Sequence, residues 1–204
     1  MQWLASRIGQ FQAMMPDIHV SLRPSDEMPR FMSDEADIDI RFRTTAQMQE
    51  AEHAGLRMAE IVRPPVFPVA SPGYLAATPA LRSAHDMMSH VLLHRRDGAM
   101  WHGWFGRQGV DVDTDALPGA RLWNMQLVLN AACQGQGIAL ANPFLVADEL
   151  RERRLCVVPC GPDEEASGVD LGAYVFTAPA DRWHSPTVAR FRRWLLKMSC
   201  GPTD

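Results

Sequence analysis

Residues 120–143, ARLWNMQLVLNAACQGQGIALANP, decide the fold of this chain. A short apolar strand leads to Asn124, whose side chain suits the N-cap of a helix with apolar residues at helical spacing. A pair of glycines then allows a tight turn before a buried strand, and Asn142 with the proline after it opens another helix. This strand–helix–strand–helix order predicts parallel strands covered by helices, which is the organisation of α/β proteins.

Regular hydrophobic patterns continue on both sides of that segment. Alternation or short apolar runs predict further strands at 18–22, 37–43, 56–62, 91–94, 155–158 and 169–177. Helical spacing or N-cap signals predict helices over 3–15, near Ser25 and Asp26, from Ser71, over 84–89, over 100–108 and from Ser185. Two breaks, Pro64-Pro65 and the polar stretch 161–168, flank the α/β segment and predict a split domain, with the C-terminal helix packed on the N-terminal one.

The composition is that of a globular protein without a nucleic-acid-binding surface. Of 204 residues, 47% are hydrophobic and 22% are charged, and 20 Lys and Arg are outnumbered by 24 Asp and Glu. Because DNA-binding modules displace counterions with clustered basic residues, this chain by itself is not expected to contact DNA. It has no apolar stretch of roughly 18 residues and no export signal at its start, so we expect no membrane association and a cytoplasmic location.

The four cysteines form no recognisable metal or disulfide motif. Cys156 and Cys160 bracket the tripeptide Val-Val-Pro, which matches neither a zinc-knuckle spacing nor a CxxC redox pair. Cys133 and Cys200 lie far from this pair in the sequence. We therefore predict reduced thiols that pack as small hydrophobic side chains.

Motifs that support enzyme chemistry are missing from the sequence. The chain has no GxSxG nucleophile elbow, no GxxxxGK(S/T) phosphate loop and no complete GxGxxG fingerprint. Its histidines are dispersed, without an HExxH-like pair. Asp37 and Asp39 share one face of a predicted strand and could form a carboxylate dyad, but a solvated or salt-bridged face is the favoured interpretation. We predict no catalytic residues, no metal ligands and no cofactor.

Polar residues recur directly after the predicted strands. In open parallel sheets, ligands bind outside the carboxyl ends of the strands, beside helix N-termini whose free N–H groups favour anions. For any one residue a helix cap or an exposed polar side chain is the commoner explanation, but the repetition predicts a shared ligand-binding crevice. The candidate residues are Ser25, Arg43, Thr44, His94, Arg95, Asn124 and Asn142, with Tyr174 near a crossover. Because most of them are hydrogen-bond donors, we expect an anionic or zwitterionic metabolite.

Motifs along nearly the whole chain resemble the effector-binding domain of LysR-type transcriptional regulators. In chain order they are residues 3–11 (WLASRIGQF), 36–41 (ADIDIR), 67–75 (FPVASPGYL), 90–94 (HVLLH), 135–140 (GQGIAL) and 191–195 (FRRWL). These motifs are most similar in sequence to those of the branch that contains the glycine-cleavage activator and the β-lactamase regulator. Each motif alone is weak, but their order and spacing are fairly specific.

This resemblance implies two Rossmann-like lobes joined by two crossover strands, as in type 2 periplasmic binding proteins. Lobe I would combine residues 1–66 with 170–204, and lobe II would be residues 67–169. A small-molecule effector would bind between the lobes. Helix 3–15 and strand 18–22 would form a homodimer with the C-terminal helix of a partner copy. DNA would be bound only by an N-terminal winged helix-turn-helix that is absent here.

The chain departs from the family pattern at its start, where the family's first strand is missing. That strand lies between two others in the doubly wound order, so strands 18–22 and 37–43 would each lose a neighbour. We expect these two strands to pair directly, or the first lobe to be loosened. Two other functions remain open on the same scaffold: a free-standing solute-binding protein, and a small α/β enzyme, which the missing catalytic motifs disfavour.

Overall fold

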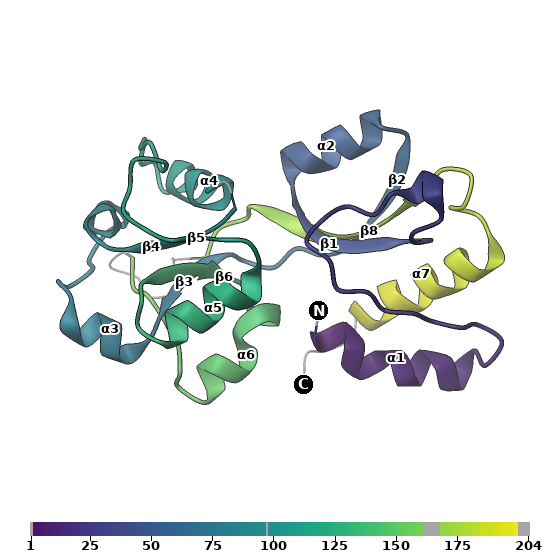
Figure 1. The fold of residues 1–204 in the computed structure, drawn as a ribbon, viewed down its shortest axis with the longest axis horizontal. Coiled ribbons are helices and arrows are strands. Elements are labelled where there is room, and N and C mark those ends of the chain that lie inside the picture. The colour runs from purple at the N-terminus through teal and green to yellow at the C-terminus, as the bar shows by residue number, and fades with distance from the viewer. Residues whose placement is uncertain (1, 97, 161–167, 200–204) are drawn as a thin grey trace. The chain divides into compact units, whose positions relative to one another are not determined.

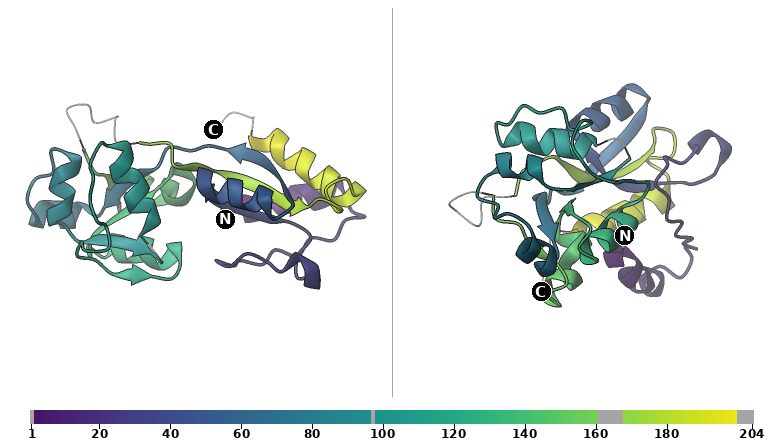
Figure 2. Two further views of the ribbon diagram at one scale, coloured as in Figure 1. Left: turned by 90° about the horizontal axis from the view of Figure 1, so that it is seen from above. Right: turned by 60° about the vertical axis from the view of Figure 1, so that its left-hand side comes forward.

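The chain divides into two compact units. The computed structural model describes residues 2–96, 98–160 and 168–199. Unit 1 consists of Met1–Arg63 with Gly172–Asp204, and unit 2 is Pro64–Leu171. Each unit has its own sheet flanked by helices (Figure 1, Figure 2). The predicted linker at 161–168 lies, except for Gly168, outside the described residues.

Unit 1 is built on an antiparallel sheet. Its strands in the described residues are β1 (Asp39–Thr44), β2 (Leu56–Val62) and β8 (Gly172–Pro179). β8 lies in the middle and pairs antiparallel with both neighbours, so that Phe176 is opposite Ile40 on one side and Ala59 on the other. As a central strand it is buried along almost its whole length. In β1, apolar and charged residues alternate, which places its charged side chains on the face opposite Ile40.

Aromatic side chains join the two terminal helices of unit 1. The helices of this unit are α1 (Gln2–Met14), α2 (Thr45–His53) and α7 (Pro186–Ser199). The ring centroid of Phe11, which is fully buried, lies 4.9 Å from those of Phe191 and Trp194. Phe191 also contacts Phe176 of β8, and α2 lies on the other side of the sheet (Figure 1). The predicted packing of the C-terminal helix on the N-terminal helix is confirmed.

The predicted strand at 18–22 is wrong. Between α1 and a short 3₁₀ helix, Phe31–Ser33, the described residues have no regular secondary structure. Ile18 is buried at the turn after α1, where its N–H donates to the carbonyl of Met15 at 3.0 Å, whereas the following residues are mostly exposed. A strand needs partners for its backbone groups, and β1 pairs with β8 instead of this segment. The helix expected near Ser25 is also absent.

Unit 2 contains a mixed sheet. Its strands in the described residues are β3 (Phe67–Ala70), β4 (Leu92–Arg95), β5 (Arg121–Leu122), β6 (Ile138–Ala141) and β7 (Cys156–Val157). Their order is β5-β4-β6-β3-β7, and β4 runs parallel to both of its neighbours. β3 pairs antiparallel with β6 and β7. The parallel strands predicted from residues 120–143 are confirmed, although β4 separates them.

Helices cover the sheet of unit 2 with apolar side chains. They are α3 (Pro72–Ala77), the 3₁₀ helix Ala84–Ser89, α4 (Ala99–Arg107), α5 (Met125–Cys133) and α6 (Pro143–Arg151). Val128 and Ala132 of α5 share a buried cluster with Ala139 of β6. Trp104 and Phe105 of α4 are fully buried and meet edge to face, with ring centroids 5.3 Å apart. In the described part of the chain, no helix is long and apolar enough to cross a membrane.

Candidate functional site

Four of the predicted site residues meet at one edge of the sheet in unit 2. Because β4 is parallel to β5 and β6, the carboxyl ends of these three strands lie at the same edge. His94 and Arg95 end β4, Asn124 follows β5, and Asn142 follows β6. Helices α4, α5 and α6 begin there too, and helix N-termini present free N–H groups that favour anions.

Two of these residues cap helices. Oδ1 of Asn124 accepts a hydrogen bond from the N–H of Leu127 at 2.9 Å, at the start of α5. Oδ1 of Asn142 accepts from the N–H of Phe144 at 3.1 Å, at the start of α6, and Asn142 is buried. Capping engages the side-chain oxygen, while the amide nitrogen of an asparagine is a further donor. Both residues therefore have the structural role that the sequence suggested, at the edge where a ligand would bind.

His94 is a buried imidazole without a hydrogen-bond partner. It is 1% exposed, and neither ring nitrogen has a partner in the described structure. Glycines enclose the ring: a β-carbon at Gly98 would lie 3.1 Å from Nδ1, and one at Gly119 would lie 3.2 Å from Cδ2. Burial lowers the pKa of His94, the Arg121 guanidinium lowers it further, and Asp115 opposes them. A neutral imidazole can donate one hydrogen bond and accept another.

An exposed tryptophan beside this edge was missed by the sequence reasoning. Trp123 is 71% exposed and comes directly before the helix cap Asn124. The guanidinium carbon of Arg96 lies 5.4 Å from the centre of its ring, which is within cation–π distance. Because most tryptophans are core residues, residue type alone does not indicate this exposed ring; its position just after a strand and before an N-cap is the available signal.

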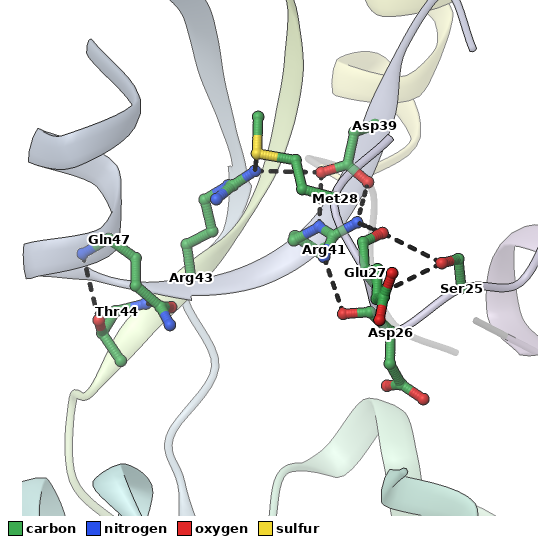
Figure 3. Close-up of polar contacts among 9 residues, drawn as sticks. All are labelled: Ser25, Asp26, Glu27, Met28, Asp39, Arg41, Arg43, Thr44 and Gln47. Atoms are coloured by element: carbon green, nitrogen blue, oxygen red, sulfur yellow. Dashed lines mark hydrogen bonds and ion pairs between the residues drawn. The ribbon is translucent and has the colours of Figure 1, made fainter. Parts of the chain in front are cut away.

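On β1 of unit 1, two arginines share one carboxylate (Figure 3). Oδ2 of Asp39 lies 2.6 Å from Nε of Arg41 and 3.2 Å from Nη2 of Arg43. Asp39 and Arg43 are buried. Burial lowers the pKa of the Arg43 guanidinium, Asp39 raises it, and the charge of Arg41 lowers it. The solvated or salt-bridged interpretation is confirmed for both carboxylates. Asp39 is paired with Arg41 and Arg43, and Asp37 is 82% exposed, with its Oδ1 3.6 Å from Nη1 of Arg182.

The segment from Ser25 to Met28 crosses this charged face. Arg41 donates from Nη1 to the carbonyl of Asp26 at 3.2 Å and from Nη2 to that of Glu27 at 2.7 Å (Figure 3). Oγ of Ser25 accepts from the N–H of Glu27 at 3.1 Å, so this side chain holds a local turn. A hollow of about 440 Å³ adjoins the segment and is lined by Ser25, Glu27, Met28, Arg30, Ser33 and Glu35.

The two remaining predicted residues of unit 1 have clear structural positions. Thr44 is the N-cap of α2: its Oγ1 accepts from the N–H of Gln47 at 3.3 Å, and its own N–H donates to Oε1 of Gln47 at 3.0 Å. Tyr174 of β8 is buried opposite Phe42, with ring centroids 5.5 Å apart. Since neighbouring residues of a strand point to opposite faces, Tyr174 and Arg43 lie on different faces of the sheet.

The predicted residues thus fall into two sets. His94, Arg95, Asn124 and Asn142 share one edge of unit 2, whereas Ser25, Arg43, Thr44 and Tyr174 belong to unit 1. Whether the two sets face one crevice stays a prediction. No group of His, Cys, Asp and Glu that could hold a metal ion occurs among the described residues. The cysteines that the structure describes are free thiols, and burial raises the pKa of Cys160 to about 12.

Comparisons with known proteins agree with this architecture. Residues 1–199 match the family model described as LysR substrate binding domain. The chain is similar to the glycine cleavage system transcriptional activator of Escherichia coli (strain K12), with 26% identity over 194 residues, which are 95% of this chain and 60% of that protein. It is also 26% identical over 197 residues to the transcriptional activator AmpR of Pseudomonas aeruginosa, covering 97% of this chain and 62% of AmpR.

A solved structure extends the similarity to three dimensions. The effector domain of AmpR of Pseudomonas aeruginosa superimposes with a TM-score of 0.78 at 26% identity, covering 97% of this chain and 88% of that one. The chain spans about 60% of the length of the curated relatives that it matches. The similarity therefore concerns one part of those proteins, which in AmpR of Pseudomonas aeruginosa includes the effector domain.

Proposed function

Because this chain belongs to the LysR substrate-binding domain family, we propose that it is the ligand-sensing domain of a transcriptional regulator. It binds a small metabolite and passes that signal to a DNA-binding domain outside this sequence. The matched relatives are activators of transcription, not enzymes. A free-standing solute-binding protein, the alternative on the same fold, is not favoured by these relatives.

One observation carries the proposal: the carboxyl edge of the parallel strands in unit 2. Three helices start there, and the buried ring nitrogens of His94 have no partner in the described structure. Buried polar groups are normally hydrogen-bonded. An imidazole without a partner at this edge therefore supports a ligand that supplies the missing hydrogen bond. Helix N-termini and donor side chains favour an anionic or zwitterionic metabolite.

The proposed contacts come from both units. In unit 2 they are His94, Arg95, Asn124 and Asn142, and in unit 1 they are Ser25, Arg43, Thr44 and Tyr174. We identify the two units with the two lobes predicted from the sequence, residues 1–66 with 170–204 and residues 67–169. That the metabolite lies between the lobes follows from this identification and is itself a proposal.

The assembly is proposed on the same basis. We expect a homodimer that uses the exposed side of α1, where Met14 is 56% exposed, together with α7 of the partner copy. Residues 18–22 form no strand, so this interface does not include the predicted strand. A regulator of this kind acts on chromosomal DNA, so we expect it in the cytoplasm.

Thermal unfolding in the presence of metabolites tests the proposal. A metabolite that binds only the folded chain stabilises it by about 2.7 kcal/mol at 100 times its dissociation constant. We expect amino acids, organic acids or phosphorylated metabolites to raise the melting temperature, and the effective compound to change expression from the promoter that the intact regulator controls. Cationic amines and neutral sugars are the controls. Stabilisation by these alone, or by none of the compounds, would contradict the proposal.

A further inference from the structure

The charged face of β1 contains more guanidinium than carboxylate. Asp39 is the shared acceptor of Arg41 and Arg43, so these three side chains carry one excess positive charge. They lie on one strand at alternate positions, and the side chain of Arg43 is only 8% exposed. A buried charge is costly unless it is paired and hydrogen-bonded. The excess charge at Arg43 therefore needs an explanation.

Arg41 is fully engaged by its surroundings. Its Nε and Nη2 donate to the two carboxylate oxygens of Asp39 at 2.6 Å and 2.7 Å, which is the strong bidentate arrangement. Its Nη1 and Nη2 also donate to the backbone carbonyls of Asp26 and Glu27. Arg41 thus neutralises Asp39 and anchors the segment 25–28 to the sheet.

Arg43 has much weaker partners. Its Nη2 reaches an oxygen of Asp39 that Arg41 already binds, at the longer distance of 3.2 Å. The same Nη2 lies 3.7 Å from the thioether sulfur of Met28, and a thioether is a weak acceptor. Its Nε is buried and has no hydrogen-bond partner in the described structure. The guanidinium is held in place, but not all of its hydrogen-bond donors have acceptors.

We propose that Arg43 binds the carboxylate of the effector, which replaces the thioether of Met28 as its partner. This assignment rests on the proposed function, and it identifies the chemical group that unit 1 recognises. A planar guanidinium with unused donors matches the geometry of a carboxylate. Arg41 has a different role: it positions the segment that covers Arg43.

The hollow beside Met28 supports this choice of ligand group. Met28 is 40% exposed and lines the hollow, and its sulfur contacts Arg43, so this side chain lies between the hollow and the guanidinium. The lining also contains Arg30 and the carboxylates of Glu27 and Glu35, which leaves one excess negative charge. This negative charge disfavours a multiply charged phosphate more than a singly charged carboxylate. The site is therefore suited to a monoanionic carboxylate.

Nuclear magnetic resonance of the arginine side chains tests this assignment directly. In the 204-residue chain labelled with ¹⁵N-arginine, the Nε–Hε signals are followed during titration with sodium acetate, and with sodium chloride and sodium phosphate at equal ionic strength. We expect acetate to shift the Arg43 signal in a saturable way and to leave Arg63, an exposed partner of Glu60, unchanged. Equal shifts at both arginines, no shift at Arg43, or a larger effect of phosphate would overturn the proposal.

Two variants separate the role of Arg43 from its contribution to folding. Met28→Ala removes the thioether from a partly exposed side chain, and we expect acetate to saturate Arg43 at lower concentration in this variant. An unchanged or weaker response would count against replacement of the thioether. Arg43→Gln should weaken binding of the metabolite found by thermal unfolding by about tenfold or more, whereas Arg63→Gln should not.

Different results would overturn the proposed function and the assignment of Arg43. If no anionic or zwitterionic metabolite stabilises the chain, the proposed function fails. If such a metabolite binds but Arg43→Gln has the affinity of the unchanged chain, the function stands and the assignment of Arg43 is overturned. Should Arg43→Gln not fold, the titrations of the unchanged chain and of Met28→Ala still decide between these outcomes.

Discussion

The backbone of Gly172 lies so close to Arg43 that a β-carbon at position 172 would be 2.0 Å from the carbonyl oxygen of Arg43. The two residues belong to neighbouring strands, in which Ala173 is the direct partner of Arg43. No real β-carbon tolerates this distance, so the first residue of β8 must be a glycine for β1 to pair there. The position of the proposed ligand-binding arginine thus depends on a glycine far away in the sequence.

Gly172→Ala is expected to destabilise unit 1. The added methyl group must push β1 and β8 apart, and overpacking of this kind typically costs about 1–3 kcal/mol. Urea unfolding measures the loss. Gly106→Ala is the matched control, because nothing lies within 4 Å of a β-carbon in this helical position. Gly106 lies in the last turn of α4, where the preference of about 0.5–1 kcal/mol for alanine over glycine in a helix interior is an upper limit, so the control should lose no stability. Equal effects of the two substitutions would contradict the close approach of Gly172 to Arg43.

Asp39→Asn should be strongly destabilising. The substitution leaves two neighbouring guanidinium groups, one of them buried, without the carboxylate that they share. Removing one partner of a buried ion pair costs about 3–5 kcal/mol. In contrast, Glu60→Gln breaks an exposed pair with Arg63 and should cost about 1 kcal/mol or less. The free energy of unfolding of each variant decides the matter, and a small effect at Asp39 would show that its pairing is not needed for stability.

Acidification is expected to destabilise the fold through His94. Burial and the Arg121 guanidinium hold the pKa of this imidazole below its ordinary value. As the pH falls below that ordinary value, about 6.5, the unfolded chain binds a proton before the folded chain does. The free energy of unfolding therefore decreases toward lower pH, and no such loss occurs above about pH 6.5.

The pH slope of His94→Gln tests this expectation. Unfolding by urea at about pH 7.5 and about pH 5.5 should show a smaller difference for this variant than for the unchanged chain. Burial also lowers the pKa of His90, so part of the slope should remain. His19→Gln, at an exposed position, is the control and should keep the full slope. An undiminished slope in His94→Gln would rule out the buried histidine as its source.

Helix caps at the carboxyl edge of unit 2 should contribute measurably to stability. Asn124→Ala and Asn142→Ala each remove a cap and should cost about 1 kcal/mol, within a usual range of about 0.5–2 kcal/mol. Asn142→Ala should cost more, because Asn142 is 3% exposed and its loss leaves the N–H of Phe144 without its acceptor in a covered site. Asn142→Asp retains the acceptor and serves as the control. Faster hydrogen exchange at the Phe144 amide in Asn142→Ala, but not in Asn142→Asp, would show that the loss of stability comes from the missing cap.

Local signals in the sequence account for most of unit 2. The caps Asn124 and Asn142, the turn at Gly135 with φ +74°, and the strand that follows it were all readable from residue type and spacing. In unit 1 the alternation around Asp39 predicted β1, but the same kind of pattern at 18–22 did not produce a strand. Alternation shows which face of a segment is apolar. Strand formation also requires a second strand as hydrogen-bonding partner, and the local pattern does not identify that strand.

The sequence likewise predicted only some features of the candidate site. His94 was predicted from its place after a strand, but its burial without a partner was not visible in the sequence. The exposed Trp123 was missed because tryptophan is usually a core residue. No sequence pattern points to Met28, because its contact with Arg43 joins a loop residue to a residue near the end of β1, 15 positions farther along the chain.

By itself, the sequence determined the α/β class, the helix caps and the family resemblance, because these depend on residue types at short, fixed spacings. Only the tertiary structure decided that β4 lies between β5 and β6 and that β8 lies between β1 and β2. It alone brought Met28, Asp39 and Arg43 into one cluster. Strand order and such clusters are set by backbone pairing and burial between segments distant along the chain. Pairing of that kind produces no periodic sequence pattern in either segment.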